Sequence, residues 1–485
     1  MIGWLSDYYV FFTLTKILKV IPMQIPAEIF KAYDIRGIVS KTLTPEIVEA
    51  IGQALGSEAT ARRQTQICIG YDGRLSGPEL AAALSRGIRK TGIHVINLGM
   101  VATPMVYFAA YHLGTNCGVM VTGSHNPPDY NGLKMVLAGE TLSGATIQGL
   151  RQRILDKQLF EGQGSESSYD IAADYIAKIK ADVQLNRQMK IAVDCGNGVA
   201  GAYAKKLYEA LGCEVEELYC EVDGHFPNHH PDPSVPENLA DLIAALKNGD
   251  AEIGLAFDGD GDRLGVVTKD GNIIYPDRQL LLFAAEVLKQ NPAATIIYDV
   301  KSTRHLAPWI QARGGQPVIW KTGHSLVKAK IKETGAALAG EMSGHVFFND
   351  SRDGRKRWYG FDDGLYAGAR LLEILSQVDD ASAALNSLPD SVSTPEQHIQ
   401  MQEGEPHKLI AALQKSATFE GANEVITIDG LRVEYADGFG LMRPSNTTPV
   451  IVLRFEADNV DALQRIQAQF RTIILAAAPA AVLPF

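Results

Sequence analysis

The sequence predicts an α/β protein with three related domains, each built on a mixed or parallel sheet, followed by a C-terminal α+β domain. The prediction depends on three apolar strands that each end in aspartate and each precede a helix and a second strand. Apolar strands that alternate with helices are typical of largely parallel sheets covered on both faces. The C-terminal part lacks this unit, so we expect a domain of another class there.

The strand–helix–strand unit is expected once in each of the first three domains. The predicted elements lie at residues 66–72, 78–91 and 94–98, at 190–194, 202–211 and 214–218, and at 295–299, 303–313 and 316–320. The first strands end at Asp72, Asp194 and Asp299. Active groups gather beyond the carboxyl ends of the strands in such units, so these aspartates mark the edge where a site is expected.

The last domain is expected to place helices on one face of an antiparallel sheet. The pattern predicts a helix over 406–415, a hairpin over 425–434, a strand over 450–455 and a closing helix over 460–474. An Asp-Gly pair within the hairpin, Asp429 and Gly430, is a turn signal.

Length and polar segments indicate where the domains divide. A chain of 485 residues is expected to hold three or four domains. The polar segments 162–168 and 391–400 are interpreted as a flexible connection and a linker. The expected divisions are an N-terminal extension at 1–24, domain 1 at 25–170, domain 2 at 171–273, domain 3 at 274–388 and domain 4 at 389–485.

The first 22 residues match no common targeting signal. Their apolar run is short and is interrupted by Asp7, Lys16 and Lys19, which argues against a membrane span. They also lack the basic region and cleavage site of a signal peptide. We interpret them as the product of an upstream start codon or as a flexible extension, with Met23 a sensible alternative start.

Composition limits the classes of function. The chain is 46% hydrophobic and 21% charged, with a net charge of −11, which argues against a binder of nucleic acid or of membrane surfaces. An anionic substrate would therefore need a local basic pocket. The five cysteines form no CxxC pair, so free thiols and a cytoplasmic location are expected.

A serine loop follows the apolar strand at 117–121. Its motif, Thr-Gly-Ser-His-Asn-Pro-Pro, spans 122–128, and the prolines break the strand so that Ser124 is expected on a turn. A hydroxyl held at a rigid strand end, with backbone amides and His125 beside it, suits a nucleophile. An ordinary polar turn is the alternative interpretation.

Three carboxylates alternate with glycine directly after the apolar strand at 252–256. Asp258, Asp260 and Asp262 can converge on one point because the glycines allow a tight turn, and their combined charge calls for a divalent cation. The small number of ligands favours Mg²⁺, completed by water or phosphate oxygens, over a calcium cage. A solvated Asp-Gly turn is the alternative.

Two further loops suit a sugar phosphate. The first, Gly-Glu-Met-Ser-Gly-His at 340–345, offers a carboxylate, a hydroxyl and an imidazole that can read sugar hydroxyls. The second, Arg-Pro-Ser-Asn-Thr-Thr-Pro at 443–449, offers an arginine and several short donors, as a phosphate dianion requires. A polar surface turn is the alternative for each.

Together the four loops describe phosphoryl transfer on a sugar phosphate. Ser124 would carry the phosphoryl group, and Mg²⁺ would offset the charge that develops during transfer. Because one motif lies in each predicted domain, the site is expected in a cleft between the domains.

These four motifs, in this order, resemble those of the α-D-phosphohexomutase superfamily. Within it the chain looks most like the bacterial phosphomannomutase/phosphoglucomutase branch, to which Gly123 and the segments 129–134 and 226–233 are also similar. The resemblance extends from about residue 25 to the end of the chain. It implies four domains around one cleft. The N-terminal extension and a charged insert at 351–358 depart from the pattern but contain no motif.

The resemblance also implies roles for individual residues. Ser124 would be the phosphoserine, and Asp258, Asp260 and Asp262 would bind Mg²⁺ with Ser124 or its phosphate completing the shell. The residues that would read the sugar or hold the non-reacting phosphate are Glu341, Ser343, Arg443, Ser445, Asn446 and Thr447. The other residues expected to line the cleft are Tyr33, Arg36, Lys134, Arg263, Lys301, His324 and His345.

The reaction cycle that the resemblance implies has two phosphoryl transfers. Phosphorylated Ser124 would transfer its phosphoryl group to the 1- or 6-hydroxyl of a mannose or glucose phosphate. The resulting 1,6-bisphosphate would reverse its orientation in the site and return its other phosphoryl group to Ser124. A hexose 1,6-bisphosphate is also the expected activator. Lys134 and His345 are the family's better candidates for general base and acid, but the residues themselves do not separate them from His324. Sugar phosphates are the expected partners. The chain is expected to be monomeric and to bind neither nucleic acid nor a membrane.

Three other functions are considered for this chain. A phosphoglucosamine mutase would share most motifs, although an Ala-Ser-His-Asn context and a different sugar loop would be expected. A sugar-phosphate hydrolase would use water as the acceptor, and a binding module would carry out no chemistry.

Overall fold

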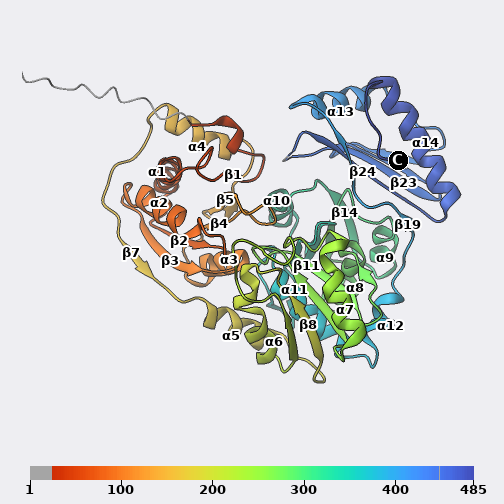
Figure 1. The fold of residues 1–485 in the computed structure, drawn as a ribbon, viewed down its shortest axis with the longest axis horizontal. Coiled ribbons are helices and arrows are strands. Elements are labelled where there is room, and N and C mark those ends of the chain that lie inside the picture. Colours follow the sequence, from red (N-terminus) through yellow and green to blue (C-terminus); the bar gives the residue numbers. More distant parts are fainter. Residues whose placement is uncertain (1–24, 447) are drawn as a thin grey trace, which may run out of the picture.

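The computed structural model describes residues 25–446 and 448–485, so the predicted N-terminal extension 1–24 and Thr447 lie outside the described residues. Four sheet-based bodies surround the centre of the molecule, and the C-terminal one, which contains β24 and α14, lies at one end of the arc (Figure 1). The predicted class, three α/β domains with mixed sheets and a C-terminal α+β domain, is confirmed.

The first sheet has seven strands, in the order β1-β5-β4-β2-β3-β7 with β6 paired to β5. Its central strands are parallel, whereas β4 and β5 are antiparallel. The strands are β1 (Ile35–Ile38), β2 (Gln66–Tyr71), β3 (His94–Met100), β4 (Gly118–Val121), β5 (Tyr130–Leu137), β6 (Glu140–Thr141) and β7 (Glu166–Ser168). The helices are η1 (Ala27–Ile29), α1 (Pro45–Ala61), α2 (Gly77–Arg89), α3 (Thr103–His112) and α4 (Ala145–Leu155).

Two helical layers cover this first sheet. Helices α1, α2 and α4 pack on one face in a separate apolar cluster, and α3 covers the other face. Helices α1 and α2 approach so closely that a Cβ atom on Gly87 would lie 2.0 Å from the Glu49 carbonyl oxygen. Glycine is therefore required where they cross.

The second sheet has the order β12-β11-β10-β8-β9. Strands β8, β9 and β10 are parallel, and β11 and β12 extend the sheet in antiparallel pairing. The strands are β8 (Lys190–Asp194), β9 (Glu214–Leu218), β10 (Ile253–Phe257), β11 (Leu264–Thr268) and β12 (Ile273–Ile274). The helices are α5 (Ala172–Asp182), η2 (Val199–Ala202), α6 (Ala204–Ala210), η3 (Pro236–Leu239) and α7 (Ala240–Asn248).

The third sheet repeats this arrangement in the order β14-β13-β15-β16, with only β16 antiparallel. Its strands, with the separate hairpin of the charged insert, are β13 (Thr295–Asp299), β14 (Gln316–Trp320), β15 (Leu338–Gly340), β16 (Val346–Phe348), β17 (Ser351–Arg352) and β18 (Arg355–Lys356). The helices are α8 (Pro276–Gln290), α9 (Leu306–Ala312), α10 (His324–Thr334), α11 (Gly364–Leu375) and α12 (Ala381–Asn386).

The last sheet is antiparallel, in the order β19-β24-β23-β22-β21 with β20 also paired to β24. Helices α13 and α14 pack on it around one apolar core. The elements are β19 (Val392–Ser393), β20 (Gln397–Gln400), α13 (Glu405–Ser416), β21 (Glu424–Ile426), β22 (Leu431–Tyr435), β23 (Gly438–Pro444), β24 (Val450–Ala457) and α14 (Val460–Ala477).

Two predictions about connecting segments were wrong. The segment 162–168, expected to be flexible, supplies β7 at the edge of the first sheet. The segment 391–400, expected to be a linker, supplies β19 and β20. Both segments are polar and lack an apolar pattern, so pairing with an existing sheet edge, rather than their own sequence, makes them strands.

One apolar core extends across the first three domains, in addition to the separate cluster under α1, α2 and α4, and the fourth domain has its own core. Trp358 is fully buried in the shared core, stacked on Tyr366 with ring centroids 4.1 Å apart and lying 5.9 Å from Phe108. Domain 4 meets domain 3 through a small apolar cluster and through buried arginines such as Arg432, whose Nη1 donates to the Val300 carbonyl oxygen at 2.8 Å. The part of the chain that the structure describes contains no helix long and apolar enough to cross a membrane.

Substitution of Trp358 tests whether the first three domains depend on the shared core. Trp358→Ala is expected to lower the free energy of unfolding by about 3–5 kcal/mol, because it leaves a large cavity where these domains meet. Trp320→Ala is the matched control, since Trp320 is only partly buried, packs against a separate cluster of domain 3 and lies under the Lys330 ammonium group. Urea unfolding checks both variants, and equal losses would contradict the shared core.

Candidate active site

Ser124 lies on the loop that follows β4. Its backbone is left-handed, with φ of 50°, and its side chain is buried. The Ser124 amide donates to Thr122 Oγ1 at 2.8 Å, and this hydroxyl donates to Asp72 Oδ2 at 2.7 Å. The Ser124 hydroxyl lies 3.1 Å from Asp258 Oδ2 and 3.3 Å from His125 Nδ1. The serine is thus fixed at the edge of the first sheet and directed toward the second domain.

Arg74 holds this serine loop from beneath. Its buried guanidinium donates to four backbone carbonyl oxygens of the loop, those of Ser124, Asn126, Pro127 and Tyr130. A Cβ atom on Gly123 would lie 2.5 Å from the Arg74 guanidinium carbon, so the loop needs glycine there. Asp72 lies 3.3 Å from Arg74 Nε and balances its charge.

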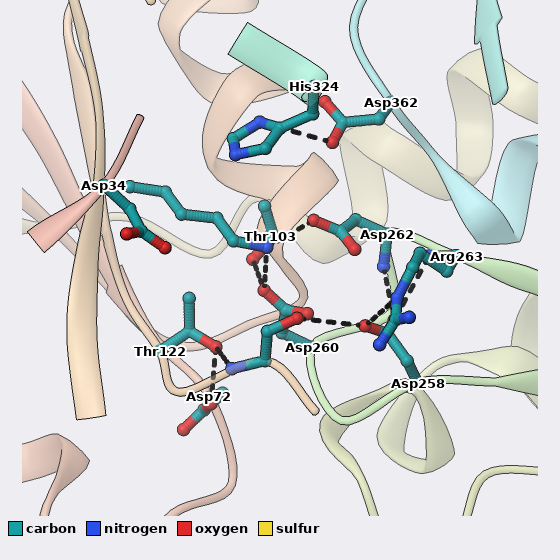
Figure 2. A network of polar contacts seen from close by, with 12 residues as sticks. Asp34, Asp72, Thr103, Thr122, Asp258, Asp260, Asp262, Arg263, His324 and Asp362 are labelled. Atoms are coloured by element: carbon teal, nitrogen blue, oxygen red, sulfur yellow. Dashed lines mark hydrogen bonds and ion pairs between the residues drawn. The ribbon is translucent and has the colours of Figure 1, made fainter. Parts of the chain in front are cut away.

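The three predicted metal ligands lie on the loop after β10. Asp258, Asp260 and Asp262 are fully buried, and one ligand atom from each lies within 4.8 Å of the other two. Figure 2 shows them grouped together, with Arg263 beside Asp258. A Cβ atom on Gly259 would lie 2.3 Å from the Ser124 carbonyl oxygen, so this glycine allows the two loops to meet.

Two cations already lie against these carboxylates. Lys134 Nζ donates to Asp260 Oδ2 at 2.8 Å and to Asp262 Oδ2 at 2.5 Å, and Arg263 Nε donates to Asp258 Oδ2 at 2.9 Å. Burial raises the pKa of Asp258 to about 7, although Arg263 opposes this shift. Burial lowers the pKa of Lys134, but Asp260 and Asp262 outweigh it and hold that pKa well above its ordinary value.

The donor set fits a divalent cation. Three carboxylates face two cations, and two oxygens, Asp260 Oδ1 and Asp262 Oδ1, accept no hydrogen bond from the described residues. Buried oxygens without a partner are costly, and a hard cation with oxygen ligands would satisfy them. This group of acidic residues could therefore bind a metal ion.

A histidine pair lies on the domain 3 side of the aspartates. His345 Nδ1 is 3.1 Å from Asp362 Oδ2 and 3.6 Å from Asp262 Oδ1, and the His324 ring stacks on it with centroids 5.6 Å apart. Burial lowers the pKa of His345, but Asp262 and Asp362 outweigh it and raise that pKa. Burial, together with Lys328, holds the pKa of His324 well below its ordinary value.

The predicted sugar loop connects β15 to β16. Glu341 Oε1 accepts a hydrogen bond from the Gly323 amide at 2.5 Å, and burial raises the pKa of this carboxyl to about 7. Ser343 lines the cleft from the same loop. Tyr33 packs edge-on against His324, with ring centroids 5.4 Å apart.

The predicted phosphate loop connects β23 to β24. Arg443 Nε donates to Asp429 Oδ2 at 3.0 Å, and the same oxygen accepts from the Thr322 amide at 3.0 Å. Asn446 Nδ2 donates to the Thr322 carbonyl oxygen at 3.4 Å. Thr447 lies outside the described residues, so its place in this loop stays a prediction.

Two other predicted cationic residues of the cleft, Arg36 and Lys301, are paired with acids or an amide. Arg36 donates to Asp34 Oδ2 and Asn126 Oδ1, at 2.5 Å in both cases, which links β1 to the serine loop. Lys301 Nζ donates to Glu396 Oε2 at 2.8 Å. These partners fix the positions of the Arg36 and Lys301 side chains, which remain positively charged.

A cavity of about 1000 Å³ brings together side chains from all four domains. The predicted site residues that line it are Tyr33, Arg36, Ser124, Lys134, Arg263, Lys301, His324, Glu341, Ser343, His345, Arg443, Ser445 and Asn446. Asp258, Asp260 and Asp262 lie beneath its wall, fully buried. Every predicted site residue that the structure describes is therefore in or directly below one cleft.

Several residues of the site were missed by sequence reasoning. They are Arg74, Asp232, Asp362, Glu396 and Asp429, each of which contacts a residue of the cleft, and Lys328, which holds Asp362. Asp362 shows why they were missed. Its partners His345 and Lys328 lie 17 and 34 residues before it in the chain, and no local motif surrounds it.

Four domain-family models match consecutive parts of the chain. They are the alpha/beta/alpha domains I, II and III and the C-terminal domain of phosphoglucomutase/phosphomannomutase, matched at 27–160, 173–271, 275–392 and 398–473.

Similar proteins span nearly the whole chain. A phosphoglucomutase of Neisseria meningitidis serogroup A is 61% identical over 454 residues, which are 93% of this chain and 97% of that protein. A phosphomannomutase/phosphoglucomutase of Pseudomonas aeruginosa PAO1 is 55% identical over 462 residues, 95% of this chain and 98% of that protein. A crystal structure of a family protein from Burkholderia thailandensis, 59% identical, superposes with a TM-score of 0.90 over 95% of this chain and 100% of that chain.

The Arg74 contacts lead to a prediction about the serine loop. Arg74→Ala is expected to lower the free energy of unfolding by about 3–5 kcal/mol, because it leaves the buried Asp72 carboxylate without its cation. Hydrogen exchange at residues 122–130 should rise in the folded protein. Arg86→Ala, which removes an exposed pair with Glu49, is the control and should cost no more than about 1 kcal/mol. Unchanged exchange in the loop would contradict the role of Arg74.

Proposed function

This chain belongs to the phosphoglucomutase/phosphomannomutase family of hexose-phosphate mutases, and on that premise we propose that it transfers a phosphoryl group between C1 and C6 of glucose and mannose phosphates through Ser124. The observation that carries the proposal is the place of the Ser124 hydroxyl. This hydroxyl lies 3.1 Å from the carboxylate of Asp258, on the loop over 258–262 that follows β10 (the aspartate loop). It faces a cleft lined by all four domains. A phosphoryl group on this oxygen would be open to the substrate on one side and to a cation on the other.

Mg²⁺ is the proposed metal, held by Asp258, Asp260 and Asp262 with an oxygen of Ser124 or its phosphate. When bound, the ion would offset negative charge on the phosphoryl group that is transferred. Lys134 and Arg263 are fixed by these aspartates at the base of the cleft. Their positive charges would also stabilise the phosphoryl group that is transferred.

Recognition of the sugar is proposed for the loop that carries Glu341 and Ser343. A carboxylate and a hydroxyl can bind the 3- and 4-hydroxyls, which lie between the two ends that must exchange places. The loop therefore suits a substrate that binds in both orientations, as the 1,6-bisphosphate must do between the two transfers.

The non-reacting phosphate is proposed to bind Arg443, Ser445 and Asn446, with Thr447 predicted to join them. The Arg443 guanidinium is held at Nε by Asp429, and its Nη2 has no hydrogen-bond partner among the described residues. That leaves a planar donor group able to bind phosphate. Three cleft residues, Lys134, His324 and His345, are the candidates for the general acid and base of the reaction.

Removal of the proposed phosphoryl carrier tests the reaction. Ser124→Ala is expected to lower kcat for conversion of mannose 1-phosphate to the 6-phosphate by on the order of 10⁴-fold or more, with little change in substrate affinity. Ser416→Ala, on an exposed helix end, is the control and should match the wild type. Substantial turnover in Ser124→Ala would exclude this route, whereas release of inorganic phosphate by the wild type without any 6-phosphate would identify a hydrolase.

Removal of the Arg443 side chain should weaken substrate binding more than it slows the chemical step. Arg443→Ala is expected to raise KM roughly 10- to 100-fold, because it removes a charge-assisted contact made in both ground and transition states. Steady-state kinetics with glucose 1-phosphate measures this change, and Arg465→Ala, an exposed residue paired with Asp437, is the control. An unaltered KM with a lowered kcat would argue for a catalytic role instead.

Metal removal tests the aspartate loop. Treatment with a chelator should abolish turnover, and added Mg²⁺ should restore it. Asp260→Asn is expected to need roughly 10- to 100-fold more Mg²⁺ for half-maximal activity, because it lacks one charged ligand. The control is Asp437→Asn, at an exposed position. Full activity after chelation would refute a metal-dependent reaction.

A further inference from the structure

The loop that connects β14 to α10 contacts the sugar loop of domain 3 and also residues of domain 4. Thr322 of this loop is half-buried and lines the cleft, and Gly323 is buried. Gly323 has a φ of 132°, and a Cβ atom there would lie 3.3 Å from two carbons of the Tyr33 ring, so glycine suits this position. The loop is therefore tightly packed at this point of the cleft wall.

The peptide groups of Thr322 are bound by domain 4. Its amide donates to Asp429 Oδ2 at 3.0 Å, and its carbonyl oxygen accepts from Asn446 Nδ2 at 3.4 Å. Asp429 Oδ2 also accepts from Arg443 Nε at 3.0 Å. One carboxylate oxygen thus holds both the Thr322 amide and the guanidinium that is proposed to bind the non-reacting phosphate.

The hydroxyl of Thr322 is bound within domain 3. It donates to Asp299 Oδ2 at 3.1 Å, and Asp299 is fully buried at the end of β13. The other carboxylate oxygen, Asp299 Oδ1, accepts from the Met342 amide at 3.3 Å. Met342 lies between Glu341 and Ser343 in the sequence, so Asp299 joins Thr322 to the backbone of the sugar loop.

The Gly323 amide makes a second connection to the sugar loop. It donates at 2.5 Å to Glu341 Oε1, which belongs to the carboxylate proposed to read a sugar hydroxyl. Two consecutive residues, Thr322 and Gly323, are therefore bonded to domain 4 on one side and to the sugar loop on the other.

Asp299 has a counterpart in domain 1, because Asp72 ends the corresponding strand of the first strand–helix–strand unit. Asp72 Oδ2 accepts from the Thr122 hydroxyl at 2.7 Å and from the Gly123 amide at 3.3 Å, and both residues belong to the serine loop. In each domain the strand-end aspartate accepts from a threonine hydroxyl and from the backbone of a loop of the active site. The contacts of Asp299 thus follow a pattern that the repeated unit uses elsewhere to support such loops.

We propose that Thr322 is a positioning residue that fixes the sugar loop relative to Arg443, and that it thereby sets how strictly the site requires the sugar hydroxyls. The inference rests on the proposed function and deepens it. A hexose phosphate presents its phosphate and its middle hydroxyls at a limited range of separations, so the groups that bind them must keep a matching separation. Thr322 supplies the bonded connection that keeps it.

The connection makes reading of the sugar depend on domain 4. Asp429 holds the Thr322 amide, and Asp299 holds its hydroxyl, so the two junctions act in series between Arg443 and the sugar loop. Loss of either junction leaves the sugar loop less well placed, although neither Thr322 nor Asp429 is proposed to bind the sugar. The accuracy of hydroxyl recognition therefore falls when a residue of domain 4 is removed.

The test compares glucose 1-phosphate with 4-deoxyglucose 1-phosphate, which lacks one hydroxyl proposed for the sugar loop. The measured quantity is the ratio of the two kcat/KM values. In the wild type this ratio is expected to be roughly 10 to 100, because the deoxy substrate loses a hydrogen bond to a charged group. Both substrates are measured on the same preparation, so the fraction of folded enzyme cancels from the ratio.

Two substitutions of Thr322 isolate its hydroxyl. Thr322→Val keeps the size of the side chain and the amide but cannot donate to Asp299, and it is expected to lower the ratio roughly 10-fold. Thr322→Ser retains a hydroxyl and should keep the ratio of the wild type. A role in stability alone would lower the yield or the activity with both substrates and would leave the ratio unchanged.

Asp429→Ala tests the connection from the side of domain 4. It is expected to raise KM for both substrates through Arg443 and also to lower the ratio. The double variant with Thr322→Val should lose no more of the ratio than the more affected single variant, because both changes break one series of contacts. Asp458→Ala, which removes a half-exposed partner of Arg304 in domain 4, is the control and should keep the ratio of the wild type.

Two results would refute the inference and leave the proposed function intact. The first is a wild type that discriminates between the substrates while Thr322→Val or Asp429→Ala discriminates as strongly. The second is a pair of losses that multiply in the double variant, since these would be independent effects. A wild type that uses both substrates equally would instead refute the sugar loop of the proposed function, and this inference with it.

Discussion

The contact between the serine loop and the aspartate loop is the constraint on which the rest of the site depends. Each loop belongs to a different sheet, and they approach so closely that no side chain fits at Gly259 against the Ser124 carbonyl oxygen. Thr103 reinforces the contact, because its amide donates to the Asp260 carbonyl oxygen at 2.9 Å and its hydroxyl to the Asp260 carboxylate. Without this approach the hydroxyl and the carboxylates would be separate surface features.

Burial of the aspartates is the energetic consequence of that contact. Three carboxylates removed from water destabilise the fold unless cations and hydrogen bonds compensate them. Lys134 and Arg263 provide part of the compensation, and the proposed Mg²⁺ would add to it. The shared core of domains 1 to 3 holds these charges in place, since Trp358 and its neighbours pack where the domains meet. Rigid support of this kind suits a site that must position a phosphoryl group.

Most of the fold and the centre of the site could be predicted from the sequence because their signals are local. The three strand–helix–strand units repeat over short stretches, and Asp258, Asp260 and Asp262 lie within five residues of one another. The edge strand β7 could not be predicted, because its polar residues become a strand only by pairing with β3. Arg74 and Asp362 were missed for a similar reason, since their partners lie far away along the chain.

Transfer of label from substrate to protein tests the central claim most directly, which is that Ser124 carries the phosphoryl group beside the aspartate loop. The phosphorylated protein would be incubated with Mg²⁺ and glucose 1-phosphate labelled in its phosphate, and its peptides would then be mapped by mass spectrometry. Labelled phosphate on Ser124, at a rate that can account for turnover, is the predicted result. Label in the 6-phosphate product without any label on Ser124, or label on another residue, would contradict the account.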